Sequence, residues 1–261
     1  MKLLFLGDII GRTGREAVLA AIPRLRQEHA LDFIIASPDN AAGGFGVTPQ
    51  IAKELLAGGV DVLTGGDHVW DQKDITPYLA QEKRLLRPAN FPASTPGFGS
   101  GIFQSASGKK ILVIHLLGQV FIKQHVNCPF AAADALLAGH SLGKNVAAIF
   151  VDFHAEATSE KTAMGQYLDG RVTAVIGSHT HIPTADARIL PKGTAYQTDA
   201  GMCGDYNSVI GFAPAGPLHR FLTKIPKAKM DPAEGKATVC GCVIEMDEGT
   251  GLAKGITTLQ I

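Results

Sequence analysis

The chain has 261 residues, of which 46% are hydrophobic and 18% are charged, an ordinary composition for a globular protein. Its 24 Lys and Arg residues balance 24 Asp and Glu residues, which argues against a protein that coats a polyanion, since nonspecific nucleic-acid binding needs a basic excess. No apolar stretch approaches the ~20 residues that span a bilayer, and the four cysteines lack C-x-x-C spacing, so we expect a soluble, cytoplasmic protein with free thiols.

Strand-like and helix-like segments alternate along the chain. The expected strands cover 2–6, 33–36, 60–64, 110–114, 146–151 and 174–176. The expected helices cover 13–26, 48–56, 74–82, 129–138 and 159–168, the second of them capped by Thr48. Three closing strands are expected at 193–198, 237–244 and 255–260. A small basic cluster at 224–229 is expected to be an exposed loop.

This order of elements predicts the fold class. Strands that alternate with helices form a largely parallel, layered α/β core, and the last quarter of the chain adds antiparallel strands. The chain shows no repeat and no long linker. We therefore expect a single domain that covers residues 1–261.

Seven carboxylate and imidazole side chains directly follow expected strands. They are Asp8, Asp39, Asp67, His68, His154, His179 and His181. In an open α/β sheet the carboxyl ends of the strands border one crevice, which is where ligands bind. The sequence thus predicts that segments separated by most of the chain bring these groups to one place.

The pair His179 and His181 indicates metal binding. A lone histidine is more often structural than a ligand, but two histidines with one residue between them, at the end of a strand, can point to one side or reach separate metals. Imidazole suits zinc, iron and manganese, and carboxylates with an Asn carbonyl add hard oxygen ligands. A mixed set of this kind suits two divalent ions, which can clamp both the attacking and the leaving oxygen of a phosphoryl displacement.

Two glycine-rich loops have competing interpretations. The loop at 7–14 follows the first strand, but its spacing is not G-x-G-x-x-G, so Asp8 is better explained as a metal ligand. The loop at 40–46 lacks the Lys-Ser/Thr of a phosphate-binding P-loop. Arg12 and Arg15 either contact a phosphate or are exposed arginines of a first helical turn.

Six ordered segments resemble the metallophosphoesterase (calcineurin-like) superfamily, and more closely its YmdB-like bacterial branch of cyclic-nucleotide phosphodiesterases. They are GDIIGRTGR from Gly7, DNAAGGFGVT from Asp39, GGDHVWD from Gly65, DFHAEATSEKTAMG from Asp152, GSHTHIPTAD from Gly177 and QTDAGMCGDYNSVIG from Gln197. The resemblance covers essentially the whole chain. It implies the layered calcineurin-like fold, in which central mixed β-sheets are flanked by helices.

The resemblance also implies a role for each site residue. One metal ion would be bound by Asp8, Asp39, Asn40 and His181. The second would be bound by Asp67, His154 and His179, with Asp39 as the bridge. A metal-bridging hydroxide would attack phosphorus in line, and His68, oriented by Asp71, would protonate the leaving alkoxide as general acid.

Relatives of this kind hydrolyse phosphodiesters, 2′,3′-cyclic nucleotides among them, and assemble as homo-oligomers. The resemblance therefore implies a small-molecule phosphodiester substrate and two divalent ions, Mn or Fe first and Zn or Mg as alternatives. A homo-oligomer is expected, whereas a membrane or an extended nucleic acid is not expected as a partner.

Three positions depart from the pattern of the branch. Asp39 stands where the branch has Glu, and Asp67 and His115 stand where Asn is usual. His115 is open to interpretation as an extra ligand, as a partner of Asp67 or as a residue without a role in the site. The departures keep open a metal-binding regulatory protein with weak or lost hydrolysis. Two further alternatives are a metal-dependent amidohydrolase and a nucleotide-binding scaffold that uses the glycine loops.

Overall fold

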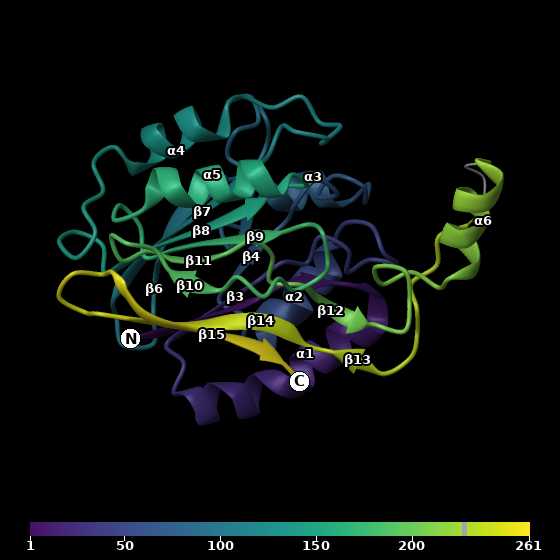
Figure 1. Ribbon diagram of the computed structural model, residues 1–261, viewed down its shortest axis with the longest axis horizontal. Helices are drawn as coiled ribbons and strands as arrows, with labels where there is room; N and C mark the ends of the chain where they lie inside the picture. Colours follow the sequence, from purple (N-terminus) through teal and green to yellow (C-terminus); the bar gives the residue numbers. More distant parts are fainter. Residues whose placement is uncertain (226–228) are drawn as a thin grey trace.

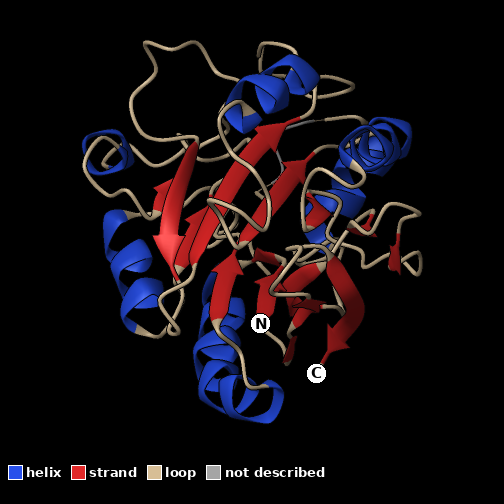
Figure 2. Cartoon of the chain, turned by 90° about the vertical axis from the view of Figure 1, so that its left-hand side faces the viewer, coloured by secondary structure: helices blue, strands red, loops and turns tan. Residues whose placement is uncertain are grey.

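The computed structural model describes residues 1–225 and 229–261, and it has a mixed α/β fold with helices outside and strands between them (Figures 1 and 2). The helices are α1 (Gly11–His29), α2 (Pro49–Ala57), α3 (Ile75–Leu79), α4 (Pro129–Leu137), α5 (Thr158–Leu168) and α6 (Ala215–Thr223). The strands are β1 (Lys2–Leu6), β2 (Asp8–Ile9), β3 (Phe33–Ala36), β4 (Val62–Thr64), β5 (Leu85–Leu86), β6 (Ser100–Gln104), β7 (Lys110–Leu117), β8 (Ala148–His154), β9 (Ala174–Ser178), β10 (Arg188–Ile189), β11 (Ala195–Gln197), β12 (Met202–Asp205), β13 (Ala237–Thr238), β14 (Cys240–Met246) and β15 (Ala253–Gln260).

Two six-stranded sheets form the centre of the fold. The first has the order β15-β14-β1-β3-β4-β5, in which β1, β3, β4 and β5 are parallel and β14 and β15 are antiparallel additions. The second has the order β10-β11-β9-β8-β7-β6, with β11, β9, β8 and β7 parallel and the two outer strands antiparallel. A small third sheet has the order β13-β12-β2. The expected parallel core with antiparallel strands late in the chain is confirmed.

The alternation of side chains along the strands produces four layers. In β1, Leu4 and Leu6 pack with Val18 and Leu55 of α1 and α2, on the helical side of the first sheet. The intervening residues of β1 face the second sheet and pack with side chains of β7, β8 and β9. The far side of the second sheet is covered by α4 and α5. Because both sheets are buried on both faces, their central strands are almost entirely apolar.

Several elements differ from their expected bounds. The expected strand at 237–244 is two strands, because Val239 leaves both sheets to exchange two backbone hydrogen bonds with Ile261. The expected closing strand at 193–198 is β11, which pairs parallel to β9. The expected helix at 74–82 is shorter, ending at Leu79. The strands β2, β5, β6, β10 and β12 and the helix α6 were not expected at all. Part of the basic cluster, residues 226–228, lies outside the described residues.

Other expectations hold at the level of single residues. Thr48 is the N-cap of α2, and its hydroxyl accepts a hydrogen bond from the backbone N–H of Ile51. All four cysteines are free thiols, and Cys203, Cys240 and Cys242 are buried. Across the described parts of the chain, no helix is long and apolar enough to cross a membrane.

Candidate metal centre and catalytic pocket

The predicted site residues all lie where strands of the two large sheets end. From the first sheet, β1 leads to Asp8, β3 to Asp39 and Asn40, and β4 to Asp67 and His68. From the second sheet, β8 ends at His154, and β9 leads directly to His179 and His181. The two sheets therefore each contribute candidate ligands to one cluster between their strand ends.

His154 directs one ring nitrogen at this centre. Its Nδ1 lies 2.9 Å from the Ser178 hydroxyl, which itself donates to Asp152 Oδ1 at 2.7 Å. Because the hydroxyl proton is used in this way, the serine oxygen accepts the Nδ1–H of His154. The unprotonated Nε2 is then left facing Asp67 Oδ1 at 3.1 Å and Asp39 Oδ2 at 3.4 Å. Lone pairs that face each other at such distances need a cation or a proton between them.

His179 adds a third donor atom to the same cluster. Its Nδ1 lies 3.0 Å from His154 Nε2 and 3.4 Å from Asp67 Oδ1, and its Nε2 lies 3.2 Å from Glu156. The ligand atoms of Asp67, His154 and His179 all lie within 4.8 Å of one another, as do those of Asp39, Asp67 and His68. A nitrogen and oxygen donor set of this spacing fits a divalent ion.

A second group of acceptors surrounds His181. Its Nδ1 lies 2.8 Å from the backbone carbonyl of Ile210 and therefore donates, so that Nε2 carries the lone pair in the neutral ring. That Nε2 faces Asn40 Oδ1 at 3.2 Å and Asp8 Oδ2 at 3.9 Å. The Asn40 amide donates through Nδ2 to the Gly44 carbonyl, so its oxygen is the atom that faces His181. These three residues again present only acceptor atoms to one another.

The carboxylates of the centre repel one another. Burial, followed by the charges of Asp67 and Asp8, raises the pKa of Asp39 well above its usual value. Burial also opposes the charge of Asp67, but the neighbouring imidazoles of His154 and His179 outweigh it and lower the Asp67 pKa. Burial by itself would lower the pKa of His179, but the neighbouring Asp67 outweighs it, so the His179 pKa is raised. Divalent ions bound between these side chains would offset the repulsion between the carboxylates.

His68 lies beside the centre and is oriented by two contacts. Its Nδ1 is 2.7 Å from Asp71 Oδ2, and the ring of Phe45 meets it edge to face at a centroid distance of 5.1 Å. Its Nε2 lies 4.0 Å from Asp67 Oδ1. The backbone N–H of His68 also donates to Asp39 Oδ1 at 3.1 Å. The ring is thus fixed with Nε2 toward the cluster, and the expected proximity of Asp71 is confirmed.

Glycine at position 66 makes room for His154. A Cβ atom built on Gly66 would lie only 2.4 Å from the His154 ring. The close approach of the loop after β4 to this ring therefore requires a residue without a side chain. The glycine before Asp67 is in this way part of the construction of the centre.

His115 is not placed as a ligand of the centre. It is fully buried, with Nε2 2.8 Å from the Gly65 carbonyl and Nδ1 3.2 Å from Asp152 Oδ2. His115 therefore lies beside Asp152 and not beside Asp67, although its Nδ1 and Asp152 Oδ2 form no hydrogen bond. His115 thus lies behind His154, at the far end of the Ser178 and Asp152 contacts.

Arg12 and Arg15, near the start of α1, are not placed to bind a phosphate at the centre. Arg12 is exposed and forms an ion pair with Glu16 within α1. Arg15 donates to the backbone carbonyl of Ala41 in the second glycine loop. Neither lines the pocket beside the metal centre; Arg12 is the expected exposed arginine, whereas Arg15 is half-buried against the second glycine loop.

A buried ion pair holds the turn that carries His179 and His181. Both histidines have left-handed backbone, with φ of 100° and 66°, which costs ~1–3 kcal/mol each for a residue other than glycine. Between them, Thr180 donates its N–H and its hydroxyl to Asp199 Oδ2, at 3.0 and 2.8 Å. Lys161 also donates to that oxygen, at 2.7 Å. Lys161 and Asp199 were not singled out from the sequence, although both lie in segments that carry the family resemblance.

Replacing Thr180 by valine tests this arrangement. The change keeps the shape of the side chain but removes one hydrogen bond to a carboxylate, so the free energy of unfolding of the metal-free protein should fall by about 1.5–3 kcal/mol. Urea titration measures the change, with Thr223→Val, which alters an exposed hydroxyl on α6, as the control. An unfolding free energy equal to that of the wild type would contradict the role of Asp199.

The family is decided by comparison of the whole chain with known proteins. A family model described as YmdB-like protein matches residues 4–259. The chain belongs to the YmdB-like family. A relative from Bacillus subtilis named 2′,3′-cyclic-nucleotide 2′-phosphodiesterase is 44% identical over 261 residues, which cover 100% of this chain and 97% of the relative. A putative phosphatase/phosphodiesterase of Mycoplasma genitalium is 39% identical over 230 residues, 85% of this chain and 80% of its own length.

Solved structures support the same assignment. A hypothetical protein from Thermus thermophilus superposes with a TM-score of 0.92 at 38% identity and covers 100% of this chain and 99% of its own. A structure described as a novel phosphatase from Mycoplasma pneumoniae has a TM-score of 0.92 at 33% identity, covering 100% and 93%. The mixed α/β architecture and the YmdB-like resemblance expected from the sequence are thereby confirmed.

Proposed function

We propose that this protein is a metal-dependent phosphodiesterase that hydrolyses 2′,3′-cyclic nucleotides. The name of the full-length Bacillus relative supports the substrate class. The observation that carries the proposal is the meeting of acceptor atoms from Asp67, His154 and His179 beside Asp39. Such a centre does not stabilise the folded protein by itself, because buried carboxylates that face one another cost free energy unless a cation binds between them.

The proposed ligands form two sets. Asp8, Asn40 and His181 would bind one ion, and Asp67, His154 and His179 the other. Asp39 would contact both, because it lies next to His154 and its pKa responds to the charges of Asp8 and Asp67. Manganese or iron suits the mixed nitrogen and oxygen donors best, with zinc or magnesium as alternatives. When bound, two such ions would polarise the phosphoryl oxygens and acidify a water molecule.

His68 is the proposed general acid. Its Nδ1 would donate to Asp71, which fixes the ring and leaves Nε2 to carry the proton toward the site. In a cyclic nucleotide the leaving group is a ribose hydroxyl, which departs as an alkoxide unless it is protonated. A proton held at Nε2 next to the metal centre meets that need.

Assembly and location complete the proposal. Formation of a homo-oligomer is supported by α6, which stands apart from the sheets in Figure 1. This helix exposes the apolar side chains of Leu218, Phe221 and Leu222. A cytoplasmic location is supported by the free thiols.

The alternative function is a metal-binding regulatory protein with weak or lost hydrolysis. It is favoured by the carboxylate at Asp67, which adds negative charge beside an anionic substrate.

Hydrolysis of 2′,3′-cAMP by metal-stripped protein, with and without added Mn²⁺, tests the function. We expect turnover only with the metal and its loss in EDTA, because the buried carboxylates need cations to bind a phosphodiester. Protein that binds Mn²⁺ but hydrolyses no phosphodiester would instead support the regulatory alternative. Metal content measured on the same samples separates this result from a failure to load the ion.

A further inference from the structure

The pocket beside the metal centre combines a polar and an apolar lining. It has a volume of about 400 Å³, which falls in the ~300–1,000 Å³ range of small-molecule sites. Its polar part includes Asp39, His68, His179 and His181, and its apolar part consists of Phe45, Ile210, Phe212 and Met230. A phosphodiester needs only the polar part, so the apolar part requires another explanation.

Two aromatic rings connect the apolar part to the candidate acid. The rings of Phe45 and Phe212 lie 5.2 Å apart at an interplanar angle of 31°, and Phe45 also touches His68. The glycine loop makes this packing possible, because Gly44 has a φ of +94° and a Cβ there would lie 2.6 Å from the Phe212 ring. Loop and ring thus fit together only with glycine at this position.

Ile210 combines backbone strain with an exposed side chain. Its φ is 46°, a rare conformation for a β-branched residue, and 45% of the residue remains exposed. Its carbonyl accepts the hydrogen bond that orients His181. Strain of this kind is retained where the surrounding structure and the function require it. Ile210 therefore places an apolar side chain at the pocket and, through its carbonyl, also positions the proposed metal ligand His181.

We propose that the apolar lining formed by Phe45, Ile210, Phe212 and Met230 is the subsite for the nucleobase of the substrate. The inference rests on the proposed function and extends it to substrate selection. A phosphodiester at the metal centre would direct its nucleoside along the pocket, where a flat base finds aromatic and aliphatic surface. Contacts of this type accept any base, because every base has an apolar π-face. The subsite should thus favour nucleoside cyclic phosphates over base-free ones without selecting one base.

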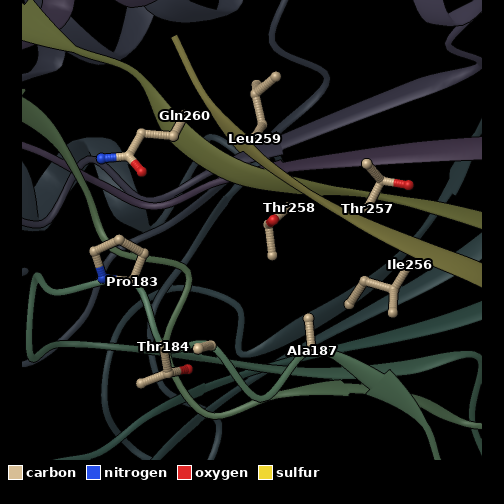
Figure 3. A pocket seen from close by; sticks show the side chains of 9 residues that line it. Pro183, Thr184, Ala187, Ile256, Thr257, Thr258, Leu259 and Gln260 are labelled. Carbon is tan, nitrogen blue, oxygen red and sulfur yellow. The ribbon is translucent and has the colours of Figure 1, made fainter.

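Another large groove lacks the combination of charged and apolar side chains that lines the pocket beside the metal centre. The groove in Figure 3, about 560 Å³ in volume, lies between β15 and the segment from Pro183 to Ala187. It is lined by uncharged residues, among them Thr257, Thr258 and Leu259. An anionic phosphodiester would find no charged partner among those side chains. The pocket beside the metal centre therefore suits a nucleotide better.

Comparison of 2′,3′-cAMP with ribose 2′,3′-cyclic phosphate, which lacks the base, tests the subsite on Mn²⁺-loaded protein. The measured quantity is the ratio of kcat/KM for the two substrates. Met230→Ala should lower this ratio about tenfold, the effect of losing one to two buried methylene groups. Ile210→Gly should lower it as well, because glycine keeps the positive φ and the carbonyl to His181 but removes the side chain. Ile102→Ala, which truncates a half-exposed isoleucine on β6, is the matched control and should leave the ratio unchanged.

Each outcome decides between defined alternatives. An unchanged ratio in both variants, or an equal loss with both substrates, would overturn the base subsite. If the wild type hydrolyses neither substrate, the proposed function fails, and binding of adenosine 3′-monophosphate measured by calorimetry then decides the subsite. Weaker binding by Met230→Ala than by Ile102→Ala would support it, and equal binding would overturn it.

Discussion

Replacing His68 by alanine should lower kcat for 2′,3′-cAMP by about 10²–10⁴-fold, the usual contribution of a general acid. Both proposed metal ions should remain bound, because His68 is not among their proposed ligands. The reason is the orientation of the ring, with Nδ1 at 2.7 Å from Asp71 and Nε2 directed to the metal centre. Steady-state kinetics together with the metal content of the same samples measure the effect.

The leaving group provides the control for this prediction. Bis(p-nitrophenyl) phosphate releases an acidic phenol that departs without protonation, so the loss with this substrate should be much smaller. Asp71→Asn should reduce kcat for 2′,3′-cAMP less than His68→Ala, because the ring and its proton remain. An equal loss with both substrates, or a loss of metal, would show that His68 acts as a ligand, as the grouping of Asp39, Asp67 and His68 permits.

Replacing Asp39 by asparagine should abolish most of the activity and at the same time stabilise the metal-free protein. We expect kcat/KM to fall by at least about 10³-fold, since the carboxylate is the proposed contact to both ions. In EDTA the melting temperature should rise, because the variant no longer holds a buried charge next to Asp67 and Asp8. Each 1 kcal/mol gained corresponds to roughly 2–4 °C.

The rise in melting temperature should depend on pH. The pKa of Asp39 is raised in the folded state, so the folded protein binds this proton more tightly than the unfolded chain does. The stability that Asp39 contributes is therefore present at low pH and is lost as pH rises above its usual pKa of 3.8. The difference between Asp39→Asn and wild type should be small near pH 4 and larger at pH 8. Thermal scans in EDTA measure it, with Asp74→Asn on the surface as the control; a lower melting temperature than that of wild type at pH 8 would contradict the argument.

Much of the fold could be predicted because its signals are local. The apolar run at 2–6 and the helical spacing of apolar residues at 13–26 are local patterns that predicted β1 and α1, whereas only the structure assigned Leu4 and Leu6 to the helical side of the sheet. The N-cap at Thr48 is a contact between residues three positions apart. The short strands β2 and β12 lacked such signals, because they form through pairing in the small third sheet and have little periodicity of their own.

The candidate site divides in the same way. The sequence by itself determined which side chains can bind metal and that they follow strands, because residue type and strand ends are local properties. Only the tertiary structure decided that Ser178 orients His154, that Asp199 holds Thr180, and that Phe45 meets Phe212 beside His68. These contacts join segments that are distant in the chain: Ser178 meets His154 through the pairing of β8 with β9, and Phe45 meets Phe212 across two separate loops. No local pattern encodes such contacts, since their free energy is gained from partners that are distant in the chain.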